Sequence, residues 1–259
     1  MNKPDNKDGT VGKALEILDL VAGLGRPVRF TELLSLSPHP KATLYRFLQT
    51  LTNQGMLSYD EERQAYSLGL RLVRMAHAAW KSASLAPVAE TILDELASTV
   101  GETIHLAQME NGQVLFVDKR RATALFETLA QTGRVAPAHC TGVGKAILAF
   151  MTPERLERAL RQQAFVTYTP ATHQDRDSLT AEFEEIRASG VAFDREEHEQ
   201  GIISIAAPVL LQNGRVVGAV SIATSTNRRT LKDLEQFRPA LVAATQKIGD
   251  AATLWQFPS

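Results

Sequence analysis

A short stretch, residues 41–53, carries side chains that could contact a nucleic acid. Wound as a helix, it has one apolar stripe at i, i+3, i+4 and i+7, formed by Leu44, Phe47, Leu48 and Leu51. The remaining surface carries two cations and no carboxylate, and it includes Lys41, Ala42, Thr43, Tyr45, Arg46 and Gln49. Lys, Thr and Tyr can contact phosphates, whereas Arg and Gln can read base edges in a DNA major groove. An ordinary solvated helix surface has the same pattern, so the neighbouring elements must decide between the two interpretations.

The sequence before this stretch predicts two further helices. Residues 11–22 form an amphipathic pattern that Gly23 and Gly25 are expected to end. Thr31 is expected to cap a brief helix that reaches Leu36. Two short helices back to back, the second with a polar outer surface, are typical of a helix-turn-helix.

The sequence after it predicts a β-hairpin. Two strand-like runs, residues 56–59 and 65–68, flank a polar turn. Three helices followed by a hairpin form a winged helix-turn-helix, which we assign to residues 10–69 as a DNA-binding domain. A winged helix that binds a protein and never meets DNA is the alternative.

The charge of the chain is distributed unevenly. The formal net charge of the 259 residues is −1, which is unusual for a nucleic-acid-binding protein. Between residues 26 and 59, however, a single acid, Glu32, faces four cations, which are Arg26, Arg29, Lys41 and Arg46. A mildly basic N-terminal segment followed by a mildly acidic remainder of the chain indicates a DNA-binding domain linked to a second domain that need not contact phosphate.

The composition indicates a globular protein of one or two domains, because 44% of its residues are apolar. No apolar run approaches the roughly 18 residues of a membrane span, and the polar N-terminus lacks the apolar core of a signal peptide. We therefore expect a cytoplasmic protein without a membrane partner. The single cysteine, Cys140, can form no internal disulfide and matches no metal motif.

The rest of the chain predicts a linker helix and an α+β domain. Residues 70–84 form an amphipathic pattern with a large apolar side, which could pack on a partner subunit or on its own domain. Residues 85–255 hold helical patterns and paired strand-like runs, with hairpin turns at Asn111-Gly112 and Asn213-Gly214. This arrangement predicts a mainly antiparallel sheet with helices packed on it.

Three local predictions concern this α+β domain. Leu125–Leu129 has the pattern of a strand. Asp177 or Ser178 is expected to cap a helix that reaches Ser189. Pro239 is expected to bend or restart the last helix.

Residues 140–145 resemble a phosphate loop but lack two of its required residues. A phosphate loop has Gly five residues before its Gly-Lys pair and Ser or Thr after the Lys, and this chain has His139 and Ala146 at those positions. Gly142 and Gly144 can instead open a helix whose free N–H groups bind a small carboxylate. A tight turn that serves packing alone is the alternative.

Three further polar residues could meet near this turn. Asp194 ends a strand-like run, and Ser204 and Ser221 lie on the two strands of the second hairpin. The side chains could point into one pocket, or the serines could face solvent at alternating positions.

We predict no catalytic residue, no metal and no cofactor. His139 and Cys140 could act as base and nucleophile, but no triad signature fixes their geometry. Two clusters offer metal-ligating side chains without a recognised ligand spacing, namely His173, Asp175 and Asp177, and His198 with Glu196, Glu197 and Glu199.

Several motifs in order make the chain resemble the IclR family of bacterial transcription regulators. They are AlaLeuGluIleLeu at 14–18, ProLysAlaThrLeuTyrArgPheLeu at 40–48, GlyMetLeu at 55–57, TyrSerLeuGly at 66–69, GlyGluThrIleHisLeu at 101–106, HisCysThrGlyValGlyLysAlaIleLeuAla at 139–149 and IleAlaAlaProVal at 205–209. The resemblance implies a winged helix-turn-helix, a linker helix at 70–84 and a GAF-like effector-binding domain at 85–255. It also implies homodimers or homotetramers on operator DNA.

The resemblance implies an effector site as well. Family members that bind small 2-oxo acids use backbone N–H groups at the glycine turn, an Asp, a Cys and two Ser, which match Gly142, Val143, Asp194, Ser204, Ser221 and Ala223. Apolar walls would come from around Leu125, Ala136 and Ile202. Ser204 replaces the usual Cys and Ala223 replaces a Ser, so one hydrogen-bond partner is lost. We expect a small organic acid such as glyoxylate or pyruvate, with an aromatic or other less polar metabolite as the alternative.

Overall fold

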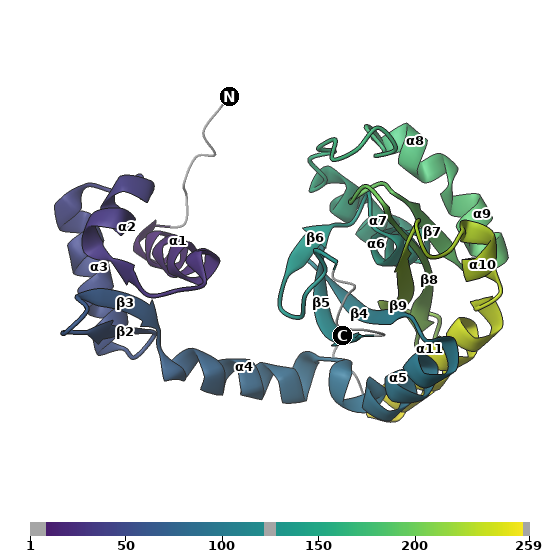
Figure 1. The fold of residues 1–259 in the computed structure, drawn as a ribbon, viewed down its shortest axis with the longest axis horizontal. Coiled ribbons are helices and arrows are strands. Elements are labelled where there is room, and N and C mark those ends of the chain that lie inside the picture. Colours follow the sequence, from purple (N-terminus) through teal and green to yellow (C-terminus); the bar gives the residue numbers. More distant parts are fainter. Residues whose placement is uncertain (1–8, 122–127, 256–259) are drawn as a thin grey trace. The chain divides into compact units, whose positions relative to one another are not determined.

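The computed structural model describes residues 9–121 and 128–255, and the chain divides into two compact units (Figure 1). The first unit ends at Lys81 and the second begins at Ser82. The strand predicted at Leu125–Leu129 falls largely outside the described residues. Within the described residues, no helix is long and apolar enough to cross a membrane.

The first unit is a winged helix-turn-helix. Its elements are α1 (Gly9–Leu24), β1 (Val28–Arg29), α2 (Phe30–Leu36), α3 (Lys41–Asn53), β2 (Leu57–Asp60), β3 (Ala65–Leu68) and α4 (Leu70–Ala83). The three strands form one antiparallel sheet in the order β1-β3-β2. The predicted apolar stripe of α3 is buried in the core that this unit shares with α1 and α2. The structure confirms the predicted fold class here.

The linker helix α4 contributes no buried residue to either unit among those described. Leu70 is 86% exposed and Val73 is 64% exposed. Of the apolar side that the sequence predicted for residues 70–84, Leu72 packs against the core of the first unit, whereas Leu70, Val73 and Trp80 stay exposed in the described chain.

The second unit is built around a six-stranded antiparallel sheet in the order β6-β5-β4-β9-β8-β7. Its strands are β4 (Thr103–Glu110), β5 (Gln113–Arg120), β6 (Val135–Pro137), β7 (Ala192–Arg195), β8 (Ile202–Leu210) and β9 (Val216–Ser225). Its helices are α5 (Ala86–Val100), α6 (Gly142–Ala149), α7 (Pro153–Arg161), α8 (Arg176–Ala181), α9 (Phe183–Ser189), α10 (Leu231–Glu235) and α11 (Arg238–Leu254).

Helices cover both faces of this sheet (Figure 1). Ile205 points to one core, with α5 and α11, while its neighbour Ala206 points to the other, with α6, α7 and α9. Successive strand residues face opposite sides, so the near-continuous apolar run of β8 is explained by burial on both faces. The GAF-like antiparallel sheet with packed helices is thus confirmed.

Several predicted helix boundaries in the first unit were wrong. Helix α1 continues through Gly23 to Leu24, because one glycine inside a helix weakens it without ending it, and the helix ends just before Gly25, the other glycine named for this role. Helix α2 begins at Phe30 and follows Arg29, so Thr31 lies inside the helix and caps nothing.

Corrections are also needed in the second unit. Asp175, rather than Asp177 or Ser178, caps α8, and its side chain accepts a hydrogen bond from the Ser178 N–H. The single helix predicted to reach Ser189 is two helices, α8 and α9. The prediction for Pro239 was right, because α11 restarts at Arg238 with this proline in its first turn.

Candidate functional sites

The outer surface of α3 is open to solvent, as a groove-reading surface must be. Lys41, Ala42, Tyr45, Arg46 and Gln49 are exposed, and Thr43 is half-buried. Neither Lys41 nor Arg46 forms an ion pair within the described chain, so both cations are available to phosphates or bases. We define these six residues as the reader face.

Contacts within the reader face hold its larger side chains. The Gln49 amide donates a hydrogen bond to the Tyr45 hydroxyl at 3.2 Å. The Tyr45 ring meets Phe30 of α2 edge-on at 6.1 Å, and the Arg46 guanidinium lies 5.7 Å from the centre of the Phe47 ring. The face is therefore partly ordered before any partner binds, which lowers the entropy cost of binding.

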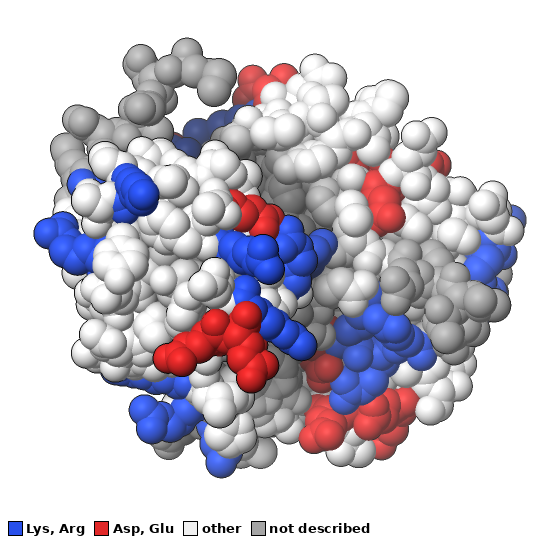
Figure 2. Space-filling model, turned by 60° about the vertical axis from the view of Figure 1, so that its left-hand side comes forward, with Lys and Arg blue, Asp and Glu red and all other residues white. Residues whose placement is uncertain are grey.

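The wing does not extend this basic character. Its tip carries Asp60, Glu61 and Glu62, and Asp60 accepts a hydrogen bond from the Arg63 N–H at 3.0 Å. Figure 2 shows basic and acidic side chains next to one another in several small groups, with larger neutral areas between them. The charged residues of the reader face are all basic, whereas the wing tip carries three acids.

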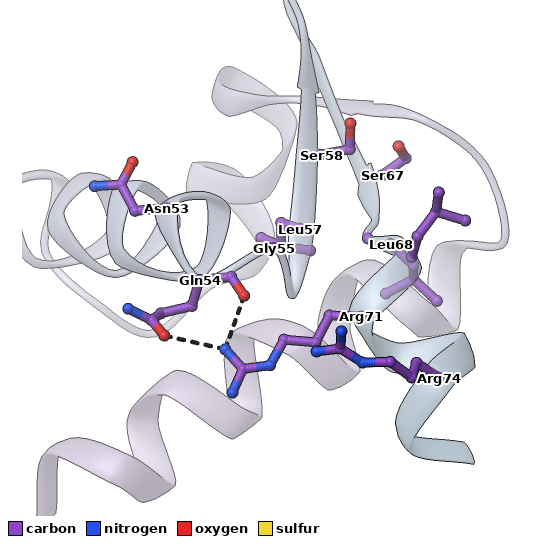
Figure 3. A pocket seen from close by; sticks show the side chains of 11 residues that line it. Asn53, Gln54, Gly55, Leu57, Ser58, Ser67, Leu68, Arg71 and Arg74 are labelled. Carbon is purple, nitrogen blue, oxygen red and sulfur yellow. Dashed lines mark hydrogen bonds between the residues drawn. The ribbon is translucent and has the colours of Figure 1, made fainter. Parts of the chain in front are cut away.

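A groove of about 850 Å³ lies where α3, the base of the wing and the start of α4 meet (Figure 3). Arg71 donates hydrogen bonds to the Gln54 carbonyl at 2.9 Å and to its side-chain oxygen at 3.0 Å. Arg74 lines the same groove one turn along α4. The hydrogen bonds of Arg71 tie the linker helix to the end of α3. The sequence analysis did not single out either arginine, although two cations three residues apart directly after the wing are a visible signal.

The predicted effector residues surround one cavity of about 40 Å³ in the second unit. Those that line it are Gly142, Val143, Asp194, Ile202, Ser204, Ser221 and Ala223. Leu125 lies outside the described residues. Ala136, which was expected in a wall, packs in the hydrophobic core on β6 instead. We call this space the inner cavity.

Strand register explains why these side chains meet. Asp194 pairs with Ser204, and Ser204 pairs with Ala223, so the three form one row across β7, β8 and β9. Ser221 lies two residues from Ala223 on the same face of β9, where it pairs with His105 of β4. The serines are buried, so the solvent-facing alternative for them was wrong.

The glycine turn places the start of α6 against this row. Thr141 caps the helix and accepts a hydrogen bond from the Gly144 N–H at 3.2 Å. A Cβ on Gly142 would lie 2.7 Å from the Ser204 hydroxyl and 3.3 Å from the Ala206 Cβ, so a larger residue would displace the serine side chain. The N–H groups of Gly142 and Val143 have no acceptor within the helix, as is general for a first turn. They border the inner cavity as a pair of donors suited to an anion.

Asp194 is 7% exposed, and its carboxyl accepts a hydrogen bond from the Glu197 N–H at 2.8 Å. Burial and the charge of Glu197 raise the pKa of Asp194 to about 7, although that hydrogen bond and Lys145 lower it. Near neutral pH a protonated Asp194 can therefore donate a hydrogen bond to an anion, where an ionised carboxylate would repel one.

His105 is a cavity residue that the sequence analysis missed as part of a site. Its two ring nitrogens face the hydroxyls of Thr128 at 3.2 Å and Ser221 at 3.5 Å, and its ring lies 5.5 Å from that of Phe116. Burial, aided by the charge of Lys119, lowers the pKa of His105 to about 3, so the ring is neutral. Only the pairing of β4 with β9, which sequence periodicity cannot supply, could have revealed it.

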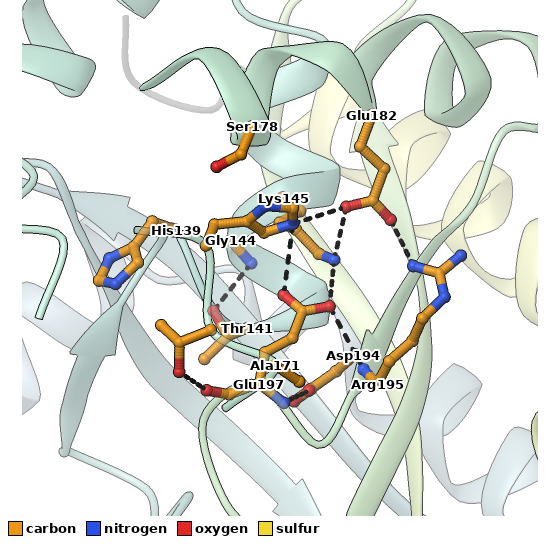
Figure 4. Close-up of polar contacts among 12 residues, drawn as sticks. His139, Thr141, Gly144, Lys145, Ala171, Ser178, Glu182, Asp194, Arg195 and Glu197 are labelled. Atoms are coloured by element: carbon orange, nitrogen blue, oxygen red, sulfur yellow. Dashed lines mark hydrogen bonds and ion pairs between the residues drawn. The ribbon is translucent and has the colours of Figure 1, made fainter. Parts of the chain in front are cut away.

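A buried lysine lies beside the cavity (Figure 4). The Lys145 ammonium contacts Glu182 at 2.7 Å and Glu197 at 2.5 Å, while Arg195 contacts the other Glu182 oxygen at 2.6 Å. Of the described residues, His173, Glu182 and Glu197 form the group compact enough to hold a metal. That group differs from both clusters considered in the sequence, and its two carboxylates already pair with the Lys145 ammonium and the Arg195 guanidinium. The sequence analysis considered Lys145 only as a phosphate-loop residue.

The environment of Cys140 does not favour a nucleophile. Its side chain is buried, and burial raises the pKa of the thiol, which disfavours the thiolate. The His139 ring lies within hydrogen-bond distance of the Val166 carbonyl, at 3.2 Å, and packs against Phe165. The two residues serve packing and local structure.

Two family models match the chain, and together they span both units. The model described as Bacterial transcriptional regulator IclR C-terminal matches residues 77–250, and the IclR helix-turn-helix domain matches residues 10–61. The chain belongs to the IclR family. This confirms the resemblance on which the effector-site residues were assigned.

Individual members of the IclR family agree with this assignment. XynR, an HTH-type transcriptional regulator of Escherichia coli (strain K12), is 32% identical over 235 residues, which cover 91% of this chain and 93% of XynR. KdgR, an HTH-type transcriptional regulator of Dickeya chrysanthemi, is 28% identical over 256 residues, 98% of this chain and 84% of KdgR. The solved IclR regulator from Alicyclobacillus acidocaldarius superposes with a TM-score of 0.78 at 26% identity and covers 94% of this chain and 98% of that one. This IclR-family chain is thus a transcriptional regulator with a helix-turn-helix and a C-terminal effector domain, and its relatives are regulators, not enzymes.

Proposed function

We propose that this IclR-family regulator binds operator DNA through the reader face of α3 and senses a small organic acid in the inner cavity. The acid's carboxylate would accept hydrogen bonds from the N–H groups of Gly142 and Val143. Ser204, Ser221 and a protonated Asp194 would donate to the remaining oxygens. The observation that carries the proposal is the meeting of these five donor groups around one cavity.

The size of the inner cavity favours a small ligand. A volume of about 40 Å³ accommodates only a few water-sized centres, since one water needs roughly 10–15 Å³ by this measure. Two- and three-carbon 2-oxo acids such as glyoxylate and pyruvate therefore fit better than larger acids. Ala223 leaves one side of the cavity without a hydroxyl, which suits the carbon end of the acid.

An aromatic acid is the second candidate, and the wall next to Ser221 favours it. Phe116 and the neutral ring of His105 offer π surfaces on which a flat ligand could stack. An aromatic acid requires the inner cavity to widen. Tighter binding of benzoate than of pyruvate would identify this case.

Calorimetric titration with a panel of acids tests the sensing half. We expect glyoxylate or pyruvate to bind the wild type and to lose most affinity in the Asp194→Ala, Ser221→Ala double variant. The variant Ser58→Ala, on the exposed wing, is the control and should bind as the wild type does. Equal binding by wild type and double variant would contradict the proposed site.

We also propose that the regulator works as a homodimer or homotetramer, as the exposed apolar residues of α4 support. Leu70, Val73 and Trp80 would be covered by a second copy. Light scattering of the wild type and of Val73→Glu tests this. A wild type that is monomeric at micromolar concentration would contradict it.

A further inference from the structure

We propose that the second unit holds another ligand site, which takes a small organic anion with an apolar part and lies apart from the inner cavity. This site, the outer basin, is a cavity of about 320 Å³ between the turn joining β4 to β5, helix α7 and the start of β9. Its volume falls in the range of roughly 300–1,000 Å³ that is usual for small-molecule pockets.

The charge of the outer basin is one-sided. Arg155 and Arg158 of α7 and Arg215 before β9 line it, and none of the described residues that line it is acidic. Neither Arg155 nor Arg158 forms an ion pair within the described part of the chain. Guanidinium groups bind carboxylate and phosphate through paired hydrogen bonds, so this lining selects an oxyanion.

Two acids are adjacent to these arginines in sequence: Glu154 forms no ion pair with either of them in the described structure, and Glu157 is engaged elsewhere. Glu157 contacts Arg161 at 3.1 Å and Arg176 at 2.6 Å. Hydrogen bonds from Arg176 and Arg161 lower the pKa of Glu157, so this carboxylate stays ionised and paired. Arg155 and Arg158 therefore lack the ion-pair partner that Arg161 and Arg176 have in Glu157.

The position of the cations on α7 is unfavourable without an anion. Arg155 stands in the first turn, where the helix dipole disfavours positive charge. Arg155 and Arg158 are also three residues apart, a spacing at which like charges repel. An anion between them would relieve both effects.

The floor of the outer basin is apolar. Met109 of β4, Ile147 of α6, Met151 and Val216 of β9 line it below the arginines. An inorganic ion would leave this floor uncovered, whereas a ligand with a ring or a short chain would cover it. The ligand class is therefore a carboxylate or phosphate that carries an apolar group.

Contacts between two walls of the basin hold them in place. Gln163, two residues after the end of α7, donates a hydrogen bond to the Gly112 carbonyl in the turn between β4 and β5. Gly112 has a φ of 76°, and a Cβ there would lie 2.6 Å from the Gln162 Cβ. The turn and the end of the helix are therefore closely packed against each other, which fixes the position of two walls of the basin.

Methyl NMR of protein labelled at methionine tests the proposal. Met109 and Met151 line the basin, while Met56 and Met75 lie in the first unit and report on non-specific effects. We expect benzoate to shift the Met109 and Met151 signals with saturation and to leave Met56 and Met75 unchanged. Inorganic phosphate, which tests the charge alone, should bind more weakly than benzoate.

Matched variants locate the binding. The double variant Arg155→Gln, Arg158→Gln should reduce benzoate affinity at least tenfold, about 1.4 kcal/mol. The double variant Arg161→Gln, Arg176→Gln removes the same charge outside the basin and should leave benzoate affinity unchanged. The absence of saturating Met109 and Met151 shifts up to about 10 mM benzoate, a weak limit for specific binding, would overturn the proposal. Equal affinity in the two double variants, or phosphate binding as tightly as benzoate, would overturn it too. The Asp194→Ala, Ser221→Ala variant distinguishes this site from the inner cavity, because benzoate should still shift its Met109 and Met151 signals.

Discussion

Replacing Lys145 with Met should destabilise the second unit strongly. The Lys145 side chain is fully buried, and its two carboxylate partners, Glu197 and Glu182, are 3% and 12% exposed. The substitution keeps most of the volume and removes the ammonium, which leaves two buried negative charges without their shared partner. Breaking a buried ion pair in this way costs about 3–5 kcal/mol. For a domain of this size that corresponds to a fall of roughly 6–20 °C in Tm.

The stability lost on replacing Lys145 should also depend on pH. Burial on its own would raise the pKa of Glu182, but hydrogen bonds from His173, Lys145 and Arg195 and the Lys145 charge lower it from 4.5 to about 2. The stabilisation from Glu182 is therefore present above about pH 4.5 and is lost as the pH falls toward 2. A carboxylate buried without a cation takes up a proton more readily. The gap between wild type and variant should thus be widest at pH 7 and narrow toward pH 4.

Urea denaturation at several pH values measures this gap. Lys247→Met is the matched control, because Lys247 pairs with Glu95 at 3.4 Å on an open surface and should cost no more than about 1 kcal/mol. The triple variant Lys145→Met, Glu182→Gln, Glu197→Gln should recover much of the loss, since it also removes the two carboxylates that have lost the Lys145 charge. A loss below about 1 kcal/mol, or one that is constant between pH 4 and 7, would refute the reasoning.

Three further predictions concern single residues of the two sites. Arg46→Ala should weaken binding to the operator duplex by about 1–3 kcal/mol in fluorescence anisotropy if Arg46 reads a base, and a folded variant with undiminished affinity would rule that role out. The pKa of Asp194 is raised from 3.8 to about 7, so between these pH values the folded wild type holds a proton that the unfolded chain releases. The stability of the wild type should therefore fall as the pH rises from about 4 to about 7. Asp194→Asn should remove that pH dependence, worth about 1.4 kcal/mol per unit of pKa, from urea midpoints, and an unchanged profile would contradict the assignment. Gly144→Ala should cost the second unit about 1–3 kcal/mol in thermal unfolding, because the new Cβ would lie 2.3 Å from the Ala138 carbonyl oxygen, whereas Gly23→Ala, with open space around it, should not destabilise the first unit.

Local patterns predicted the helices and hairpins well. The stripe of Leu44, Phe47, Leu48 and Leu51 fixes which side of α3 is buried, and hence that Arg46 is exposed. The Asn111-Gly112 turn likewise determines that β4 and β5 pair. Both depend on residues close together in the chain, which is why periodicity and turn chemistry suffice.

Helix starts were less predictable, because neighbouring residues compete for the same cap. Asp175, Asp177 and Ser178 are all good capping residues, and in the structure Asp175 takes the position. The start of α2 at Phe30 has no capping side chain at all. Propensity alone could not select either start.

The composition of the inner cavity needed strand register, which the sequence does not contain. His105 and Ser221 are 116 residues apart and meet only because β4 pairs with β9 in one particular alignment. The Lys145 network similarly joins α6, the start of α9 and the segment after β7. A buried lysine has no local signature, so this network could not be predicted.

The most direct measurement is the binding of this protein to the duplex just upstream of its own gene, by fluorescence anisotropy at two salt concentrations, with and without pyruvate or glyoxylate. We predict specific binding that weakens as salt rises and that changes at least several-fold when one of the acids is added, with no such change in Asp194→Ala, Ser221→Ala. Binding that no acid alters would contradict the sensing role of the inner cavity. The absence of any salt-dependent binding to that duplex would contradict the reader face and favour a partner that is a protein.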